Sequence, residues 1–417
     1  MSFQQGLSGL NAASKNLEVI GNNVANANTV GAKSSRAEFG DIYATAINGR
    51  SVGIGVNLQA VTQQFTQGNI TTTDGPLDLA INGNGFFEVS NGAQTLYTRN
   101  GQFQANKDGF IAINAGLKLV GYPAAKDGTI QPGAAVPLQL PTGGVEPNPT
   151  GRVGIEMNLD ARKATTLPAA APLIDFGNAR TYNDATSVTV FDGKGQDVAL
   201  TYYFQKASTD TWNVYATVNG TPTSTDALGN PTPVTTISFP PNGGVPTAPL
   251  GTVAFDIPST TNAAGATTLP FTGIALDLTG ATQYGSGFGV TRMAQDGYAA
   301  GQLTGVTIEK TGIVMATYSN GQSKPAGQLE LATFRNPQGL SPLGGNLWAR
   351  SASSGDPTVG TPNSGNIGVL QAGALEESNT DLTGELVNMI TAQRIYQANA
   401  QTIKTQDQVL QTLVNLR

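Results

Sequence analysis

The chain begins "MSFQQGLSGLNAASKNLEVIGNNVANANTVGAKSSRAEF" (residues 1–39), in which a helical pattern stops in a run of Asn, Ala and Gly. Large apolar side chains recur at heptad spacing over the first 25 residues, and the small residues Ser14 and Gly21 occupy the skipped positions. This apolar seam consists of Phe3, Leu7, Leu10, Leu17 and Val24, with Ile20 beside it. We therefore predict an amphipathic N-terminal helix that ends in a linker.

Residues 378–417 carry a second helical pattern, which contains no Pro and only one Gly, Gly384. Asn379 or Asp381 can cap its start, because both side chains accept hydrogen bonds from free backbone amides. The apolar seam and its adjoining residues are Leu382, Leu386, Met389, Ile390, Tyr396, Ile403, Leu410, Leu413 and Val414. The sequence therefore predicts a long amphipathic C-terminal helix.

Two amphipathic helices at the ends of a chain need partners for their apolar faces. An isolated helix of about 25 residues is marginal in water, so its stability has to come from packing. Both helices carry apolar residues beside the main seam, such as Ala12 and Val387, which suits packing against several neighbours. Two arrangements remain open: an intramolecular coiled coil that ties the termini together, and a tube in which the helices of many subunits pack.

The interior of the chain changes from helical to strand periodicity. Apolar and polar side chains alternate, for example, along residues 198–204 and 212–218. Turn dipeptides punctuate such runs, among them Asp108-Gly109, Asn219-Gly220 and Asn320-Gly321. The interior is therefore predicted to be antiparallel β-structure in sandwiches or small barrels.

Gly- and Pro-rich stretches at 140–152 and 282–297 divide the interior. We predict a multidomain α+β fold, in which the terminal α-helices form a coiled-coil-like inner domain and nested antiparallel β domains lie between them. The predicted parts are an inner helical domain (1–30 with 376–417), a connector (31–71 with 357–375), a discontinuous first β domain (72–147 with 286–356) and an inserted outer β domain (148–285).

Composition argues against several classes of function. The 417 residues include no His and no Cys, which removes the usual general base, the Ser-His and Cys-His nucleophile pairs and the common zinc ligands. We therefore predict no enzyme activity and no metal or other cofactor. The net charge of −6, without a long basic run, argues against a nucleic-acid partner.

Membrane insertion and a cleaved leader are not expected either. No stretch approaches the roughly 20 consecutive apolar residues that a membrane-spanning helix needs. The N-terminus has no basic n-region and no unbroken apolar segment, which a cleaved signal peptide requires. The glycine-rich segments "NGNGFF" (82–87) and "GSGFGV" (285–290) are predicted to be turns, because neither opens a helix that could bind a phosphate.

Specific motifs stand at both ends of the chain. They are "SGLNAASKNLEVIGNNVANANTVGAKS" (8–34) and the segment from "GALEESNTDL" to the last residue (373–417), with shorter ones such as "YTRNGQFQ" (97–104) inside. These segments resemble the bacterial flagellar hook protein family, which shares its terminal pattern with the flagellar rod proteins. The resemblance covers most of the chain and is weakest in the block 150–285.

The linker after the first helix follows the family pattern Asn-x-x-Thr-x-Gly-Phe-Lys with one departure. Ala32 stands where the family has an aromatic residue, which puts in doubt the packing that this ring supplies. The resemblance assigns a hinge and linker role to this segment. The residues of the linker are Asn22, Asn23, Asn26, Asn28, Thr29, Gly31 and Lys33.

The resemblance implies a structural subunit that polymerises into a flexible curved tube, the flagellar hook, which acts as a universal joint between rod and filament. It implies that the seam residues of both helices pack between subunits and form the inner wall. Other implied partners are the rod and hook–filament junction proteins, the hook cap, the hook-length control protein and the flagellar type III export apparatus. The implied location is extracellular, after export without a cleaved signal peptide.

Three other interpretations compete with that of a hook protein. A rod protein shares the terminal motifs, but the straight rod does not need the extra block at 150–285. A surface adhesin or autotransporter passenger is also β-rich, but it predicts a cleaved signal and a C-terminal membrane anchor. A glycosidase-like enzyme would need two suitably placed carboxylates, which no motif supplies.

Overall fold

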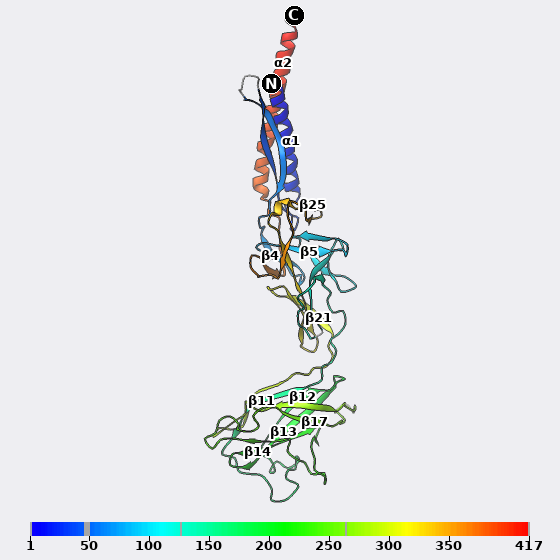
Figure 1. Cartoon of the computed structure of the whole chain (residues 1–417), viewed down its shortest axis with the longest axis vertical. Coiled ribbons are helices and arrows are strands. Elements are labelled where there is room, and N and C mark those ends of the chain that lie inside the picture. Colours follow the sequence, from blue (N-terminus) through cyan, green and yellow to red (C-terminus); the bar gives the residue numbers. More distant parts are fainter. Residues whose placement is uncertain (1, 46–50, 126, 263–264, 416–417) are drawn as a thin grey trace. The chain divides into compact units, whose positions relative to one another are not determined.

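The computed structural model describes residues 2–45, 51–125, 127–262 and 265–415, and it has one long helix at each end with β-structure between them (Figure 1). α1 spans Ser2–Ala25 and α2 spans Leu382–Asn415. The described chain between them contains strands, turns and a single 3-10 turn, Pro337–Gly339. The prediction of terminal helices around a β-rich interior is confirmed.

The chain forms two compact units. Unit 1 consists of Met1–Thr142, Thr304–Thr317 and Ser323–Arg417, and unit 2 consists of Gly143–Leu303 and Tyr318–Gln322. The segments that enter and leave unit 2 pair with each other: Val145 N–H donates to the carbonyl oxygen of Gly301 at 2.8 Å, and Gly301 N–H donates back at 3.2 Å. Unit 2 is therefore built almost entirely from one continuous stretch of chain.

The largest sheet has the strand order β21-β22-β23-β9-β5-β6-β26-β25. These strands are β21 (Leu303–Ile308), β22 (Ile313–Tyr318), β23 (Ser323–Leu329), β9 (Lys118–Pro123), β5 (Phe86–Ser90), β6 (Thr95–Thr98), β26 (Leu347–Ala349) and β25 (Ser341–Gly344). Joined to it are β7 (Phe103–Ala105), β8 (Ile111–Ile113), β10 (Val136–Pro137), β24 (Leu331–Thr333) and β27 (Thr358–Gly360).

Three two-stranded sheets complete unit 1, and two of them bring the N-terminal and C-terminal parts of the sequence together. They are β1 (Ser35–Thr45) with β2 (Ser51–Gln63), β3 (Ile70–Thr72) with β29 (Ala374–Glu376), and β4 (Leu79–Asn82) with β28 (Val369–Ala372). Because β3 pairs with β29 and β4 with β28, the chain leaves α1 and returns to α2 along adjacent strands.

Unit 1 contains an aliphatic core and a separate aromatic cluster. The aromatic cluster consists of Phe86, Tyr97, Ala332, Phe334, Leu340 and Trp348, with Phe65 packed against it. The ring of Phe65 lies 5.4 Å from those of Phe86 and Trp348, edge to face in both pairs. Edge-to-face geometry is the favoured arrangement of aromatic rings, so this cluster fixes the segment after β2 against the β-structure.

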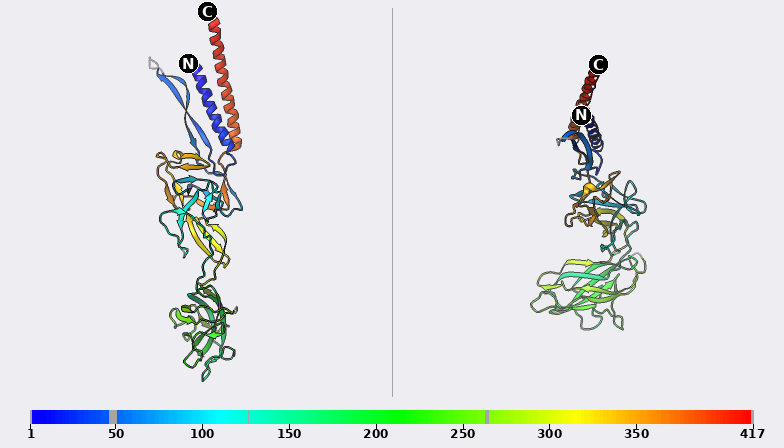
Figure 2. Two further views of the ribbon diagram at one scale, coloured as in Figure 1. Left: turned by 90° about the vertical axis from the view of Figure 1, so that its right-hand side faces the viewer. Right: turned by 45° about the horizontal axis from the view of Figure 1, so that its top comes forward.

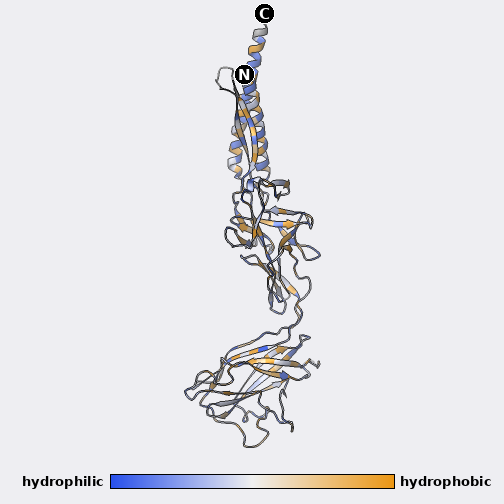
Figure 3. Ribbon diagram, viewed as in Figure 1, coloured by the Kyte–Doolittle hydropathy of each residue, from blue (hydrophilic) through white to orange (hydrophobic). Residues whose placement is uncertain are grey.

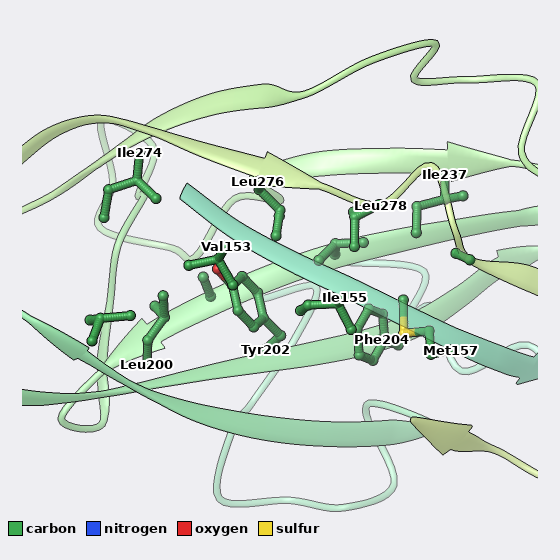
Figure 4. Packing of buried hydrophobic residues seen from close by; sticks show 14 of the residues in the cluster. Val153, Ile155, Met157, Leu200, Tyr202, Phe204, Ile237, Ile274, Leu276 and Leu278 are labelled. Carbon is green, nitrogen blue, oxygen red and sulfur yellow. The ribbon is translucent and has the colours of Figure 1, made fainter. Parts of the chain in front are cut away.

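Unit 2 is a sandwich of two five-stranded sheets. One sheet has the order β17 (Val253–Ile257), β18 (Phe271–Asp277), β11 (Arg152–Asp160) and β19 (Thr282–Tyr284), with β20 (Gly289–Gln295) also on β11. The other has β12 (Asp184–Phe191), β13 (Asp197–Ser208), β14 (Thr211–Val218) and β15 (Thr221–Pro222), with β16 (Thr235–Ser238) on β14. Figure 4 shows alternate side chains of β11, such as Ile155, packed against those of β13, such as Phe204.

The prediction of purely antiparallel sheets is wrong at β11. This strand pairs in parallel with β18, where Arg152 lies opposite Ala275, and with β19, where Asn158 lies opposite Thr282. Parallel neighbours need a long crossover connection. Here the whole second sheet lies between β11 and β18 in the sequence, so it supplies that connection.

The predicted turn dipeptides do join strands. Asn219 and Gly220 have φ values of 47° and 84° between β14 and β15, as the mirror-image hairpin turns require. The segment "NGNGFF" contains the turn between β4 and β5, and no helix follows it. The prediction that its glycines are turn residues is confirmed.

Candidate functional site: the terminal helices and their junction

α1 and α2 run antiparallel and pack along one side of α1 (Figure 2). The contact depends on small residues: a Cβ added at Gly6 would lie 3.1 Å from Ile403, and one at Gly9 would lie 2.7 Å from Asn399. Ala13, one heptad after Gly6, is only 6% exposed. Small side chains at these positions allow the two helix axes to approach closely.

Ile403 is part of this contact, but many of the other predicted seam residues are exposed. Phe3 is 46% exposed, Ile390 is 52% exposed and Leu410 is 55% exposed. Figure 3 shows such hydrophobic residues distributed among hydrophilic ones along both helices. Leu7, Leu382, Leu386 and Tyr396 are also exposed, whereas Leu10, Leu17, Val24, Met389 and Ile403 are half-buried and Ile20 is buried. The side chains of Leu413 and Val414 lie outside the described residues.

The β1–β2 hairpin lies along α1 (Figures 1 and 2). The side-chain amide of Gln5 donates to the carbonyl oxygen of Gly53 at 2.6 Å, and the backbone amide of Val56 donates to Ser8 Oγ at 3.3 Å. Gly55 has φ of 138° and faces Ser8 so closely that a Cβ would collide with that side chain. The hairpin therefore packs against α1 through the backbone of its glycines, which have no side chain to keep the two apart.

Two asparagines fasten the base of this hairpin to the helices. Asn23, in the last turns of α1, donates to the carbonyl oxygen of Ser35 and accepts from its N–H, both at 2.8 Å. Asn379 accepts from Ser34 N–H at 2.8 Å and donates to the carbonyl oxygen of Gln64 at 2.7 Å. Each amide side chain thus pairs with backbone N–H and C=O groups at the end of a strand, which would otherwise lack a partner there.

The two candidates for capping α2 have different roles. Asp381 accepts from Thr383 N–H at 3.0 Å and immediately precedes the helix, which is the geometry of an N-cap. Asn379 instead holds the hairpin base. The helix therefore begins at Leu382 because Asp381 satisfies one of its free amides.

A buried ion cluster lies where the linker meets the β-structure. Lys33 Nζ is 2.7 Å from Glu376 Oε1, and Arg99 Nη1 is 3.0 Å from Glu376 Oε2. The side chains of Lys33 and Glu376 are fully buried, and that of Arg99 is 5% exposed. Lys33 also donates to the carbonyl oxygen of Thr66 at 2.8 Å, and Arg99 donates to that of Gly83 at 2.9 Å. One carboxylate therefore joins the N-terminal linker, the β-structure and the segment before α2.

The electrostatics of this cluster depend on mutual pairing. Burial lowers the pKa of Lys33 and that of Arg99, and the carboxylate of Glu376 opposes both effects. Gly68 N–H donates to Glu376 Oε1 at 2.9 Å, and the guanidinium of Arg99 lies 5.4 Å from the Phe86 ring centroid. Buried charges are tolerated only when they are paired and hydrogen-bonded. The three ionised groups therefore require one another.

The linker residues divide into an exposed and a buried part. Asn22 and Asn28 are exposed, while Asn26 donates to Asn22 O at 3.0 Å and Thr29 N–H donates to Asn26 O at 3.0 Å. Gly31 is buried with φ of 70°, and a Cβ there would lie 2.6 Å from the backbone nitrogen of Asn100. The hinge role stays a prediction, and the end of the segment at Gly31 is held tightly.

Ala32 is 5% exposed and lines a pocket of about 190 Å³. The walls of this pocket include Asn26, Gln63, Asn346 and Trp348. The position at which the family pattern has an aromatic residue thus borders open space in this chain.

The sequence patterns do not single out Arg99, Glu376 or the hairpin role of Asn379. Arg99 lies in "YTRNGQFQ" and Glu376 in "GALEESNTDL", so both were within segments already singled out. The available signal was that charged residues make up only 12% of the chain. The pairing of residues 33, 99 and 376 is long-range, and a single sequence does not show it.

Two kinds of site are absent from the described residues. No group of three or more His, Asp or Glu side chains there is placed to hold a metal ion. Neither helix, over its described part, is long and apolar enough to cross a membrane. The features that remain are the exposed faces of α1 and α2 and the junction that holds them.

Four family profiles match the chain. They are described as flagella basal body rod protein (residues 3–33), flagellar hook protein FlgE/F/G D1 domain (80–163), flagellar basal body protein FlaE D2 domain (158–298) and flagellar basal body rod FlgEFG protein C-terminal (371–416). Together they account for both helices, a smaller part of the β-structure of unit 1 and nearly all of unit 2.

Curated relatives match over the whole length. The flagellar hook protein FlgE of Salmonella typhimurium is 42% identical over 422 residues, covering 100% of both chains. FlgE of Borreliella burgdorferi is 30% identical, covering 100% of this chain and 99% of that one. Among solved structures, Helicobacter pylori flagellar hook protein FlgE2 superposes with a TM-score of 0.52 at 16% identity, over 73% of this chain and 100% of that chain. This last likeness concerns the fold alone.

Proposed function

Because this chain belongs to the family of bacterial flagellar hook proteins, which are structural and not enzymes, we propose that it polymerises into the tubular hook. In that role the polymer passes torque from the rod to the filament while it bends, as a universal joint does. The subunit contacts further copies of itself through the two terminal helices, which line the inner wall.

The exposed apolar faces of α1 and α2 carry this proposal. Leu386 is 45% exposed and Ile390 is 52% exposed on one helix, and Leu7 is 44% exposed on the other. Exposed apolar surface of this extent is unfavourable in water, at about 25 cal/mol per Å². In a helical polymer each subunit offers a different surface to each neighbour, so stripes on two helices can be covered in several directions at once.

The remaining steps of the proposed life cycle are suggested by the family resemblance alone. The subunit is exported through the flagellar type III apparatus without a cleaved signal peptide and assembles outside the cell. Its partners there are the rod proteins, the hook–filament junction proteins, the hook cap and the hook-length control protein. The absence of Cys from all 417 residues suits a hook that is held together without disulfides.

The proposal is tested by changing the α2 face and leaving the fold of the monomer intact. We expect the double variant Leu386→Gln, Ile390→Gln to be made and exported, because both side chains are exposed in the isolated chain. It should fail to form hooks in cells whose own hook gene is deleted. Electron microscopy of basal bodies measures assembly, and the amount of protein in the medium measures export.

Leu228→Gln is the matched control, since Leu228 is 87% exposed and belongs to unit 2. This variant should form hooks of normal length. Hooks of normal length and number from the α2 double variant would refute the proposal. Unchanged thermal unfolding of the purified double variant would show that its defect lies in assembly and not in folding.

A further inference from the structure

Unit 1 holds two glutamates near each other: Glu88 lies in β5, and Glu330 immediately precedes β24. β5 and β24 are antiparallel, with Phe87 opposite Leu331 and Phe86 opposite Ala332. Glu88 and Glu330 are the next residues beyond these pairs. Like charges that lie close together repel.

The two carboxylates are poorly exposed to water and incompletely hydrogen-bonded. Glu330 is 2% exposed, and Tyr122 of β9 shares a hydrogen bond with it. Glu88 is half-buried, and its Oε2 is buried without a hydrogen-bond partner among the described residues. A carboxylate oxygen that is unpaired as an acceptor can be satisfied by carrying the proton itself.

Neither carboxylate forms an ion pair within the part of the chain that the structure describes. Tyr97 of β6 lies opposite Glu88 and is 3% exposed. Arg350 and Asp356 also face this region, but Arg350 is 64% exposed and pairs with Asp356 at 2.7 Å. Lys118 of β9 is directed elsewhere, since its Nζ lies 3.6 Å from the Phe110 ring centroid. The groups that surround the two carboxylates are therefore tyrosines and an ion pair that is already complete.

These surroundings shift the titration of the whole cluster. Burial, and then the charge of Glu330, raise the pKa of Glu88 to about 7. Burial also raises the pKa of Glu330, against the hydrogen bond from Tyr122. Burial and the charge of Glu88 raise the pKa of Tyr97 to about 12. All three shifts favour the protonated form, and burial is the largest cause of each.

The pair lies beside the aromatic cluster. Phe86, two residues before Glu88, belongs to that cluster, and so do Tyr97 and Ala332, which are neighbours of Glu88 and Glu330. The Phe86 ring centroid lies 5.8 Å from that of Trp348 and 5.4 Å from that of Phe65. A force that pushes β5 and β24 apart at Glu88 therefore acts on the rings that hold the segment after β2.

We propose that Glu88 carries a proton on its buried, unpartnered oxygen beside the carboxylate of Glu330, and that loss of this proton loosens the aromatic cluster and destabilises unit 1. With the proton in place, Glu88 is uncharged beside Glu330. Without it, two adjacent carboxylates repel each other in a site with little water. The inference concerns the folded chain itself and does not depend on the proposed assembly into a hook.

The sign of the effect follows from the direction of the shift. The folded pKa of Glu88 lies above its ordinary value of 4.5, at about 7. The contribution to stability is therefore fully present below about pH 4.5 and is lost as pH rises toward 7. We expect the unfolding equilibrium constant of unit 1 to rise by about three- to tenfold per pH unit in this window, the lower figure reflecting the partial exposure of Glu88.

Urea unfolding at pH 5, 6, 7 and 8 measures this dependence. The chain has two Trp residues, and Trp212→Phe in every protein leaves Trp348, inside the aromatic cluster, as the only tryptophan reporter. Glu88→Gln should abolish the component of the slope between pH 5 and 7, because no titrating group remains at that position. Glu330→Gln should reduce it, since the repelling charge is gone but burial persists. The Trp348 emission of the parent should also shift to the red between pH 6 and 8.

Glu309→Gln is the control, because Glu309 is an exposed carboxylate of the same unit. It should leave the pH dependence unchanged. A parent protein with the same slope as Glu88→Gln would overturn the proposal. Two single variants whose effects on the slope add up to that of the double variant would also overturn it, because the proposal requires the charge of Glu330 to act on Glu88.

Discussion

At the scale of single residues, this chain has few charged side chains, and three of them are buried together. Lys33, Arg99 and Glu376 form a cluster in which each ion has two or more hydrogen-bond partners. Exposed pairs such as Lys15 with Glu18, at 2.8 Å, are screened by water and contribute little. The buried cluster is therefore where a single substitution affects the link between the helices and the β-structure most.

Glu376→Gln removes the carboxylate and leaves two buried cations beside each other. We expect the free energy of unfolding of unit 1 to fall by about 3–5 kcal/mol, because breaking a buried pair leaves uncompensated charge. Urea unfolding at pH 7 measures the loss. Glu18→Gln, which breaks the exposed pair on α1, should cost less than about 1 kcal/mol. Equal losses in the two variants would show that the buried cluster is not a special contact.

At the scale of elements, α1 has two different faces. One face consists of small residues that meet α2, among them Gly6, Gly9 and Ala13. The other carries the apolar seam, in which Gly21 has open space where its Cβ would be. Heptad spacing alone cannot tell these two faces apart. Residues seven positions apart lie on the same side of a helix, and this is true of either face.

The two faces respond differently to the same substitution. Gly6→Leu should separate α1 from α2, because its side chain meets Ile403, whereas Gly21→Leu should be accommodated in the isolated chain. We expect amide exchange in α1 to speed up at least about tenfold for Gly6→Leu, which corresponds to about 1.4 kcal/mol of lost local stability. Exchange in Gly21→Leu should stay equal to the parent or slow down, since Leu has the higher helix propensity. Similar exchange in both variants would place the helix contact elsewhere.

At the scale of the whole molecule, the two units have separate hydrophobic cores. Trp348 belongs to the aromatic cluster of unit 1, and Trp212 lies in the sandwich core of unit 2. The segments that enter and leave unit 2 pair with each other at Val145 and Gly301. A core of this kind contains what a domain needs to fold independently.

We expect a fragment of residues 143–303 to fold without the rest of the chain. Its thermal unfolding, followed by Trp212 fluorescence, should be cooperative, with a midpoint within about 3 °C of the Trp212 transition in the full chain, equivalent to about 1 kcal/mol for a domain of this size. A fragment that begins at Ile155 lacks the start of β11 and serves as the control that should not fold. A non-cooperative transition of fragment 143–303 would show that unit 2 needs unit 1.

Periodicity alone was enough to place both terminal helices and the change to strand structure between them, because these patterns depend on local backbone geometry. The dipeptides Asn219-Gly220 and Asn320-Gly321 predicted turns, because the turn type selects these residues. Only the tertiary structure decided three other features. They are the parallel pairing of β11, the joining of Lys33 and Arg99 by Glu376, and the proximity of Glu88 and Glu330. The physical reason is that strand pairing and charge burial join residues far apart in the chain, and these contacts exist only once several segments have packed together.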